Sequence, residues 1–232
     1  MSKIQQVNRR DFVKLFGLAS GGILLGCNIS SDKKEFIPQV GGTFTPNLFV
    51  QIQQDGNIIL LASRSEMGQG IRTSLASAIA DELEADWKYI TVKQATGNAK
   101  YGNQNTDGSR SVRTLLEPMR KMGATAKAML ITAAANKWNI PETDCKAENH
   151  FIINTQNNDT IFFGDLVDEA ANVAIPAAES IELKKVEDFK FIGKTLKSVD
   201  LKDFTHGTAN YGMDIRIPNM KFAAIARCPV TF

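Results

Sequence analysis

The sequence predicts a mixed α/β fold, in which strand hairpins and two main helices form one domain and a second domain begins near residue 181. Three observations support this prediction: apolar runs flank turn-forming residues, apolar positions recur at helical spacing in two long segments, and strand-like runs separate those segments. Hydrophobic residues make up 43% and charged residues 22% of the 232 positions, which is ordinary for a globular protein with a substantial core.

The first half of the main domain alternates strands with one helix. Residues 47–63 contain two strand-like runs around Asp55-Gly56, a pair typical of hairpin turns. From residue 71 an apolar residue occurs every fourth position, which predicts an amphipathic helix over 71–86. The apolar positions of that helix are Ile71, Leu75, Ile79 and Leu83. Residues 89–95 (YITVKQA) are again typical of a strand.

The second half of the domain begins with a polar loop rich in Gly and Asn over 96–111. A long helix is predicted over 112–138, and its many small residues permit close packing against a neighbouring helix. Residues 149–163 predict a second hairpin around an Asn-Asn-Asp turn, and residues 164–172 a short helix.

The C-terminal region has a weaker pattern. Residues 178–207 mix charged and apolar residues without a helical period, so strand and connector are predicted there. A last strand-like run covers 220–230. The main domain is therefore predicted to span 44–180, with further structure over 181–232.

The first 27 residues are typical of an export signal. A twin arginine, Arg9-Arg10, precedes an apolar run that is shorter than the roughly 20 residues of a membrane-spanning helix. Paired arginines favour the Tat route, and the closing motif LLGC is similar to a bacterial lipobox, in which Cys27 is lipidated. We expect a lipid-anchored periplasmic or cell-envelope protein with a polar tether over 28–43. The alternative is a short buried N-terminal helix.

The positive charge of the chain is concentrated in this leader. The whole sequence has a formal net charge of +2, from 27 basic and 25 acidic residues. Residues 1–27 carry four basic residues and one acidic residue, so the remainder is slightly acidic. No nucleic-acid partner is therefore expected.

Neither the cysteines nor the histidines follow a metal-binding pattern. Beyond Cys27 there are only Cys145 and Cys228, without a CxxC motif or zinc-like spacing, and whether these two pair stays open. His150 and His206 lie in neither an HExxH nor a His-x-His motif. A surface or structural role is favoured for both histidines, and no metal site is predicted.

Two transitions from loop to helix are the candidate functional sites. The first junction is Gly68-Gln69-Gly70, directly before the predicted helix at Ile71. The second junction is Gly108-Ser109-Arg110-Ser111, directly before the predicted helix at Val112. The start of a helix offers unpaired backbone N–H groups and a partial positive charge, so both junctions can bind an anion. Glycine also permits close approach of a ligand to the backbone.

The side chains at the junctions extend this prediction. Ser109 and Ser111 provide hydroxyl donors, and Arg110 or Arg113 can complete a phosphate clamp. Gln69 provides a neutral amide donor.

Simpler roles for the same residues remain open. Ser109 or Ser111 can serve only as a helix N-cap, and the glycine pair around Gln69 can form only a turn. Glu66 lies close enough in sequence to act as a general base, but a carboxylate in a loop is usually solvated.

Three segments resemble, in order, parts of the xanthine dehydrogenase/aldehyde oxidase family of molybdenum hydroxylases. SEMGQGIRTSLASAIADELEADW (65–87) is similar to the family's EMGQG segment, and GNQNTDGSRSVRTLLEPMRKMGATAKAMLITAAA (102–135) to its second cofactor segment. THGTANYGMDIRIPNMKFAAIARCP (205–229) resembles the opening of the hammerhead domain. Together with the leader, this order resembles the exported large (beta) subunits of the isoquinoline 1-oxidoreductase branch.

The resemblance implies a molybdopterin-binding-type domain over 44–180, followed by a connector and a truncated hammerhead domain over 181–232. In the family, the glutamine of the GQG segment lies at the molybdenum–pterin centre, which implies this place for Gln69. The serine-containing segment wraps the pterin phosphates. The cofactor-binding residues implied in this chain are Gly68, Gln69, Gly70, Gly108, Ser109, Arg110, Ser111 and Val112. The implied cofactor is a molybdenum–pterin group, in the molybdopterin cytosine dinucleotide form usual in bacterial members.

The resemblance also implies an oxidoreductase that hydroxylates an aldehyde or an N-heterocycle, with water as the oxygen source. Electrons would pass to a [2Fe–2S] small (alpha) subunit. The family's catalytic glutamate lies in a Gly-x-Gly-Glu motif near the C-terminus of the large subunit, and this sequence contains no Gly-x-Gly-Glu, so no catalytic residue is expected in this chain. The expected partners are the small subunit, the C-terminal part of the large subunit, a small-molecule substrate and, through Cys27, the membrane.

A function of a different class remains open at this stage. The same domain can serve as an envelope-tethered, non-catalytic module that binds a partner or ligand without the catalytic half. Molybdenum and pterin analysis of the purified protein separates the two hypotheses.

Overall fold

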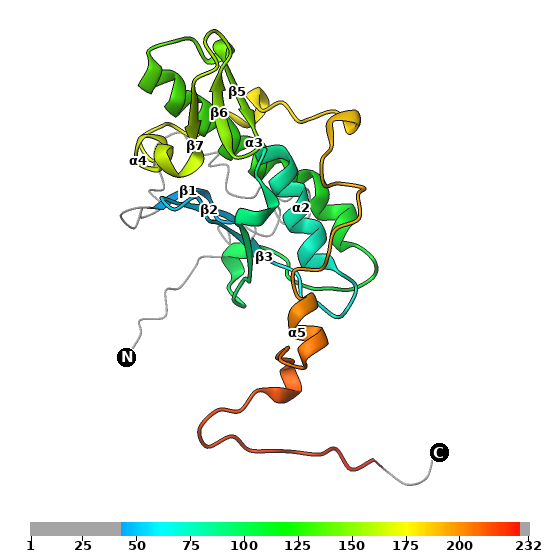
Figure 1. Ribbon diagram of the computed structural model, residues 1–232. Coiled ribbons are helices and arrows are strands. Elements are labelled where there is room, and N and C mark those ends of the chain that lie inside the picture. The colour runs from blue at the N-terminus through cyan, green and yellow to red at the C-terminus, as the bar shows by residue number, and fades with distance from the viewer. Residues whose placement is uncertain (1–42, 228–232) are drawn as a thin grey trace, which may run out of the picture. The chain divides into compact units, whose positions relative to one another are not determined.

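The computed structural model describes residues 43–227, which form two β-sheets and a small set of helices (Figure 1). The predicted mixed α/β class is confirmed. The chain divides into two compact units, one reaching Ser198 and the other beginning at Val199. The predicted leader with Cys27, the tether up to residue 42 and Cys228 lie outside the described residues.

The first sheet has four strands in the order β1-β2-β3-β4. Its strands are β1 (Thr43–Asn47), β2 (Val50–Gln53), β3 (Ile58–Ala62) and β4 (Ile90–Gln94). Strands β2 and β3 form the predicted antiparallel hairpin. Strand β4 runs parallel to β3, which requires a crossover, and helix α2 (Ile71–Leu83) supplies it. Strand β1 was not predicted because it contains Pro46, which an edge strand tolerates.

Helix α3 (Ser111–Trp138) crosses α2, as the small residues of its sequence predicted. The close approach depends on Gly123, where a Cβ atom would lie 2.3 Å from the Ile79 carbonyl oxygen. The core between the sheet and the two helices is fully apolar at its centre. Phe44, Ile52, Leu60, Ile79 and Leu130 are each at most 1% exposed. Burial of these large side chains is the main term that stabilises the unit.

The second sheet is antiparallel, with the order β5-β6-β7. Its strands are β5 (Cys145–Glu148), β6 (Phe151–Asn154) and β7 (Thr160–Phe162), followed by helix α4 (Val167–Ala170). The β6–β7 hairpin and the short helix were predicted, whereas β5 was not. A strand of only four residues, with two charged side chains, has no distinctive pattern of its own.

His150 joins the two sheets. It is completely buried, and its Nδ1 accepts a hydrogen bond of 3.2 Å from the backbone N–H of Asp86. The other ring nitrogen, Nε2, lies 2.9 Å from the carbonyl oxygen of Gly56, so it carries the proton and donates. Burial lowers the pKa of His150 and keeps the ring neutral. The predicted structural role of this histidine is confirmed.

The strand predicted within 178–207 is wrong. The structure has short 3₁₀ turns at Ala178–Ser180 and Val186–Asp188, and then helix α5 (Leu201–His206). The reason is a tertiary contact: backbone N–H groups that a strand would use for pairing donate instead to the buried carboxylates of Asp81 and Glu82. Further 3₁₀ turns in the described chain are Trp87–Tyr89, Ala99–Tyr101, Glu142–Asp144, Phe163–Leu166 and Gly212–Asp214.

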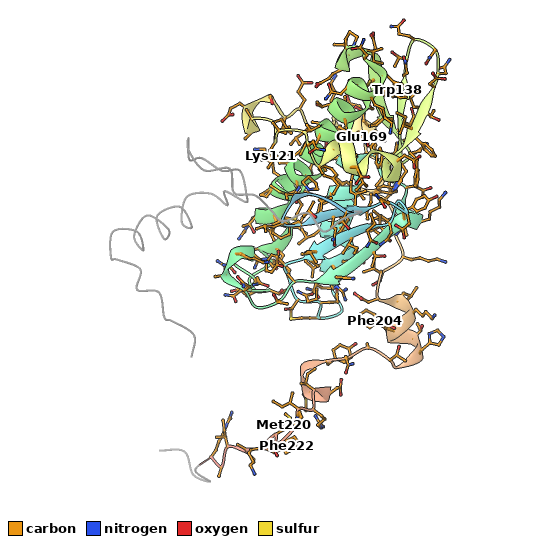
Figure 2. All side chains as sticks on the ribbon, turned by 90° about the vertical axis from the view of Figure 1, so that its left-hand side faces the viewer. Lys121, Trp138, Glu169, Phe204, Met220 and Phe222 are labelled. Carbon is orange, nitrogen blue, oxygen red and sulfur yellow. The ribbon has the colours of Figure 1, made fainter. Side chains whose placement is uncertain are left out.

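The second unit contains α5 and an irregular chain after it. The rings of Phe204 and Tyr211 stack with their centroids 6.5 Å apart. The side chain of Phe222, labelled in Figure 2, is 72% exposed. The strand predicted over 220–230 is absent from 220–227, because a strand needs a neighbour and this unit has no other strand among its described residues. Among residues 43–227, no helix combines the length and apolar character needed to cross a bilayer.

Candidate functional site

The two junctions lie at the same edge of the first sheet. Strands β3 and β4 are parallel, so their carboxyl ends meet at one edge, and each strand leads through a loop to the start of a helix. Thr106 ties the loops together: its hydroxyl accepts from the backbone N–H of Ser65 at 2.9 Å and donates to the Ser65 carbonyl at 3.1 Å. The fold therefore brings together two segments that are separated by about forty residues.

The first junction is closed by a side chain of its own loop. Gly68 and Gly70 both have positive φ angles, 92° and 81°, which turn their N–H groups inward. One oxygen of Glu66 accepts from these two N–H groups at 2.9 and 2.8 Å. The other oxygen accepts from the N–H of Arg72, in the first turn of α2, at 3.2 Å. Glu66 is therefore the anion at the start of α2.

The ionisation of Glu66 follows from this geometry. Partial burial would raise the pKa of its carboxyl group, but the hydrogen bonds from Gly70, Arg72 and Gly68 outweigh burial and hold the pKa below its ordinary value. A carboxylate that accepts several backbone hydrogen bonds is a poor proton acceptor near neutral pH. The contacts assign Glu66 a capping role at α2.

Gln69 is exposed, and both ends of its amide contact its own loop. Its Oε1 accepts from the N–H of Met67 at 2.6 Å, and its Nε2 donates to the carbonyl of Ser65 at 3.1 Å. A primary amide has two N–H groups, so Nε2 keeps one donor for a ligand. The loop thereby orients the side chain that the sequence singled out.

The second junction has a different geometry. Gly108 and Ser109 both have φ of 52°, an uncommon conformation for serine. Arg110 precedes α3 without capping it. Its guanidinium instead forms two hydrogen bonds of 2.8 Å to the carboxylate of Asp107, which partly neutralises the predicted phosphate clamp. Among the described residues, no side chain accepts from the first N–H groups of α3, which begins at Ser111.

Arg64 is a residue that the sequence analysis missed. It follows β3, is only 3% exposed, and donates from Nη1 to the side chain of Asn103 at 3.3 Å. Its Nε has no hydrogen-bond partner among the described residues. Burial lowers the pKa of Arg64 while the negative charge of Asp107 raises it. The available signal in the sequence was an arginine at the carboxyl end of an otherwise apolar strand. Burying the charge of such an arginine costs free energy unless the side chain finds partners.

A pocket of about 370 Å³ lies between α2, α3 and residues 191–198. Gly70 of the first junction and Val112 of the second both line it. The walls are mixed: Leu116 and Ile192 are apolar, whereas Ser77 contributes a hydroxyl. The volume falls in the range of ordinary ligand pockets, which run from about 300 to 1,000 Å³. Of the predicted site residues, only Gly70 and Val112 reach the pocket wall.

No three His, Cys, Asp or Glu side chains gather as a metal site within residues 43–227. Cys145 is half-buried and forms no disulfide with any residue of the described range 43–227, and burial raises the pKa of its thiol. His206 is exposed and contacts the carbonyl of Lys202. The candidate chemistry of the described chain therefore lies at the two junctions and the pocket beside them.

The family model for the molybdopterin cofactor-binding domain matches residues 2–216. The chain belongs to this family. Its relatives include the beta subunit of isoquinoline 1-oxidoreductase from Brevundimonas diminuta, 27% identical over 97% of this chain. One of the subunits of nicotinate dehydrogenase from Pseudomonas putida is 31% identical over 78% of this chain. A membrane-bound aldehyde dehydrogenase (pyrroloquinoline-quinone) from Gluconacetobacter polyoxogenes is 29% identical over 93%.

The chain spans about a third or less of these curated relatives: 34%, 15% and 29% of their respective lengths. Solved structures with partial similarity include quinoline 2-oxidoreductase from Pseudomonas putida 86, with 17% identity, 56% of this chain and 17% of that chain covered, and a TM-score of 0.43. The Cu,Mo-CO dehydrogenase has 23% identity, covers 50% of this chain and 15% of that chain, and also has a TM-score of 0.43.

Proposed function

We propose that this chain forms part of the molybdenum–pterin cradle in the large subunit of a molybdenum hydroxylase. One observation carries the proposal: the two junctions converge at the carboxyl ends of β3 and β4, in a chain of the molybdopterin cofactor-binding domain family. In open α/β sheets, ligands bind in the crevice at the carboxyl ends of the strands.

The residues present fit a phosphorylated pterin best at the second junction. The first N–H groups of α3 have no side-chain acceptor among the described residues, and Ser109 and Ser111 add hydroxyls. A phosphate is held well by such a helix start. The unpartnered Nε of buried Arg64 lies in the same loop system and is a further donor.

The first junction fits the neutral part of the cofactor rather than a phosphate. Glu66 already places a carboxylate on the N–H groups of α2, so a second anion there would be repelled. Gln69 keeps one amide N–H and can hold a neutral or weakly charged acceptor without a proton transfer. We therefore assign Gln69 to the pterin and metal end, and Gly108–Val112 to the phosphate end.

When bound, the molybdenum–pterin group supplies the two-electron oxidation in which an oxygen atom from water enters the substrate. The contribution of this chain is binding and orientation. The positive-φ glycines let the ligand approach the backbone, the helix start holds its negative charge, and the apolar walls at Leu116 and Ile192 exclude water.

The rest of the proposed assembly follows from the relatives and from the leader. Relatives named for isoquinoline, nicotinate and aldehyde oxidation support an electron-poor N-heterocycle or an aldehyde as the substrate class. We propose a [2Fe–2S] small subunit as the electron acceptor and the remaining part of the large subunit as the source of the catalytic base. Export by Tat and a lipid on Cys27 would place the complex at the cell envelope.

Cofactor analysis tests this function. The protein is purified with its complete assembly, and molybdenum is measured together with the pterin released from it. About one equivalent of each per large subunit is expected for a single site of this type. Absence of both would overturn the proposal and favour the non-catalytic module. Pyrroloquinoline quinone in place of a pterin would also overturn it, and one relative is named for that cofactor.

A further inference from the structure

The pocket beside the junctions has one wall that buried carboxylates hold in place. This wall is part of the covering segment, which we define as residues 184–198. Six of its residues line the pocket, together with residues from the first two turns of α2 and α3: Phe191, Ile192, Gly193, Lys194, Leu196 and Ser198. The segment belongs to no sheet, so its position depends on side-chain contacts.

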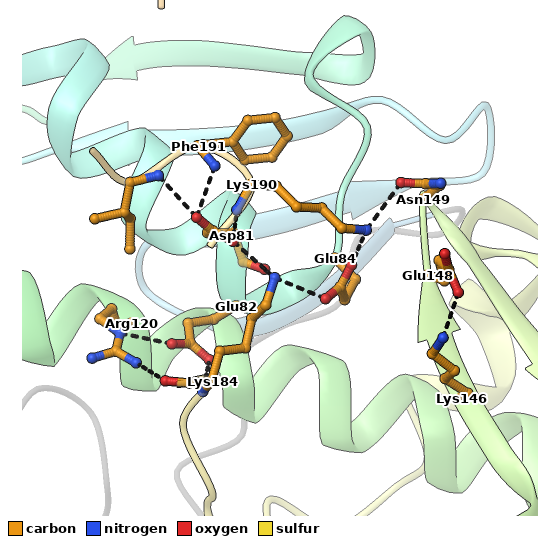
Figure 3. A network of polar contacts seen from close by, with 11 residues as sticks. Asp81, Glu82, Glu84, Arg120, Lys146, Glu148, Asn149, Lys184, Lys190 and Phe191 are labelled. Carbon is orange, nitrogen blue, oxygen red and sulfur yellow. Dashed lines mark hydrogen bonds and ion pairs between the residues drawn. The ribbon is translucent and has the colours of Figure 1, made fainter. Parts of the chain in front are cut away.

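The main contact is the carboxylate of Asp81, near the end of α2. Its side chain is completely buried, and it accepts four hydrogen bonds from the covering segment (Figure 3). One oxygen accepts from the ammonium of Lys184 at 2.8 Å and from the N–H of Lys190 at 3.1 Å. The other oxygen accepts from the N–H groups of Phe191 and Ile192, both at 2.9 Å. Phe191 and Ile192 are the first residues of the covering segment that line the pocket.

Glu82 holds the earlier end of the covering segment. It is also fully buried, and its carboxylate accepts from Arg120 Nε at 2.7 Å and from the backbone N–H of Lys184 at 3.0 Å. The same arginine donates to the carbonyl of Lys184 at 2.6 Å. Two adjacent buried carboxylates thus satisfy backbone groups that would otherwise need a strand partner.

An outer layer of charge surrounds these contacts without touching the backbone. Glu84 pairs with the ammonium groups of Lys184 at 2.8 Å and Lys190 at 2.6 Å (Figure 3). The side chains of Lys184 and Glu84 are only 8% and 12% exposed, so this ion pair is largely buried, but the Glu84 carboxylate contacts no backbone N–H group of the wall. Asp81 and Glu84 therefore offer a matched pair: Asp81 binds the backbone of the wall, and Glu84 binds only lysine side chains around it.

We propose that Asp81 is a positioning residue for the pocket: it fastens residues 190–198 over α2 and α3, and loss of its carboxylate opens the pocket locally. Asparagine in its place has one oxygen and one NH₂ group, so it cannot accept from four donors and turns a donor toward backbone N–H groups. The anchor does not depend on what the pocket binds. Its effect on cofactor retention does rest on the proposed function.

Thiol labelling of the full-length chain measures the opening. Ser77 lines the pocket and is only 6% exposed, so a cysteine at this position reacts when the wall moves. Ala134, in the core of α3 and 0% exposed, reports global unfolding in the same way. Peptide mass mapping separates both positions from the native cysteines.

The expected result is local. Asp81→Asn should raise the labelling rate of Ser77→Cys by about tenfold or more and leave that of Ala134→Cys unchanged, because only a sub-global opening is introduced. Glu84→Gln should raise the labelling rate at position 77 clearly less than Asp81→Asn does, because Glu84 contacts lysine side chains and no backbone N–H group of the wall. An unchanged rate at position 77, or an equal rise at both positions, would overturn the proposal.

A second variant covers the case in which Asp81→Asn does not fold. Lys184→Met removes the charged partner of Asp81 but leaves the donors of Lys190, Phe191 and Ile192. A rise of about threefold at position 77 alone is then expected, and no rise would overturn the proposal. Pterin content of the assembled Asp81→Asn protein should fall. Faster labelling with unchanged pterin content would confirm the anchor and count against placing the cofactor at this pocket.

Discussion

The two junctions have similar sequences but different structures. Each places glycine before a helix at the carboxyl end of a parallel strand, yet Glu66 fills the start of α2 while α3 begins without a side-chain cap. The difference shows that a helix start is an anion site only if the chain has not already supplied the anion. It is also the basis on which we propose different tasks for the junctions, with charge held at the second and a neutral contact at the first.

The largest effect is expected where α2 and α3 cross, because this crossing holds the junctions together. In Gly123→Ala the new Cβ would lie 2.3 Å from the carbonyl oxygen of Ile79, so the helices must move apart. Overpacking destabilises this variant, and the better helix propensity of alanine offsets about 1 kcal/mol of that cost. The free energy of unfolding should therefore fall by about 2 kcal/mol. Denaturant unfolding measures it. Gly97→Ala is the control, since nothing lies within 4 Å of its Cβ; equal stability of both variants would contradict the observed crossing.

The next largest effect is expected when the capping carboxylate of Glu66 is replaced. Glu66→Gln loses the charge and at least one acceptor at the start of α2, and should lower the free energy of unfolding by about 1–2 kcal/mol. Phosphate should then stabilise this variant more than the original protein, because the first junction has become an open helix start. Thermal unfolding with and without phosphate measures both effects. No loss of stability would mean that the carboxylate is dispensable.

The same carboxylate predicts a pH dependence. Because the pKa of Glu66 is lowered in the folded state, its contribution is fully present above the ordinary value of 4.5 and disappears as the pH falls through the lower folded value. The difference in unfolding free energy between the original protein and Glu66→Gln should therefore shrink in acid. A difference that stays constant from neutral to strongly acidic pH would show that charge is not its source.

A smaller effect is expected at the second junction, and only when ligand is bound. Ser109→Ala and Ser111→Ala should leave the fold intact, since neither hydroxyl caps α3. Each should weaken cofactor retention by about 1 kcal/mol, the typical value of one hydrogen bond. Pterin content after dialysis of the assembled protein measures this. Ser180→Ala, far along the chain, is the control, and equal pterin content in all three variants would leave these hydroxyls without a binding role.

The smallest effect on stability is expected at Gln69. Gln69→Ala removes two hydrogen bonds within an exposed loop, so the free energy of unfolding should change by less than about 0.5 kcal/mol. If Gln69 contacts the pterin and metal end as we propose, activity of the assembled complex should nevertheless fall, because the amide is missing. Unchanged activity would mean that the first junction serves only as a turn.

Much of the local structure could be predicted from spacing alone. The four-residue repeat from Ile71 and the long Ala-rich segment gave both main helices, with boundaries close to those of α2 and α3. The Asp55-Gly56 turn correctly placed the β2–β3 hairpin. These predictions succeed because periodicity and turn chemistry are local properties. Strands β1 and β5 were missed because short or proline-containing strands are defined by their neighbours.

The site could be predicted less completely. Glycine and serine patterns identified both junctions, but whether Glu66 is solvated or bonded to Gly70 depends on the path of the loop. Arg110 or Arg113 was predicted to complete a phosphate clamp, and the spacing did not indicate that Arg110 pairs with Asp107, three residues away. Arg64 gave no signal beyond its position after a strand. The hydrogen bonds of such side chains depend on which partner atoms come within about 3 Å. The spacing of residues along the sequence does not specify those partners.

By itself, the sequence determined the two main helices, the β2–β3 and β6–β7 hairpins and the two glycine-marked helix starts, because these follow from patterns along the chain. Only the tertiary structure decided that β3 and β4 run parallel and so bring the helix starts to one edge. It also decided that Asp81 and Glu82, which look like ordinary helix-surface acids, are buried as anchors for a segment about one hundred residues away. The physical reason is that burial converts a carboxylate from a solvated charge into a group that must find donors, and those donors came from a distant backbone.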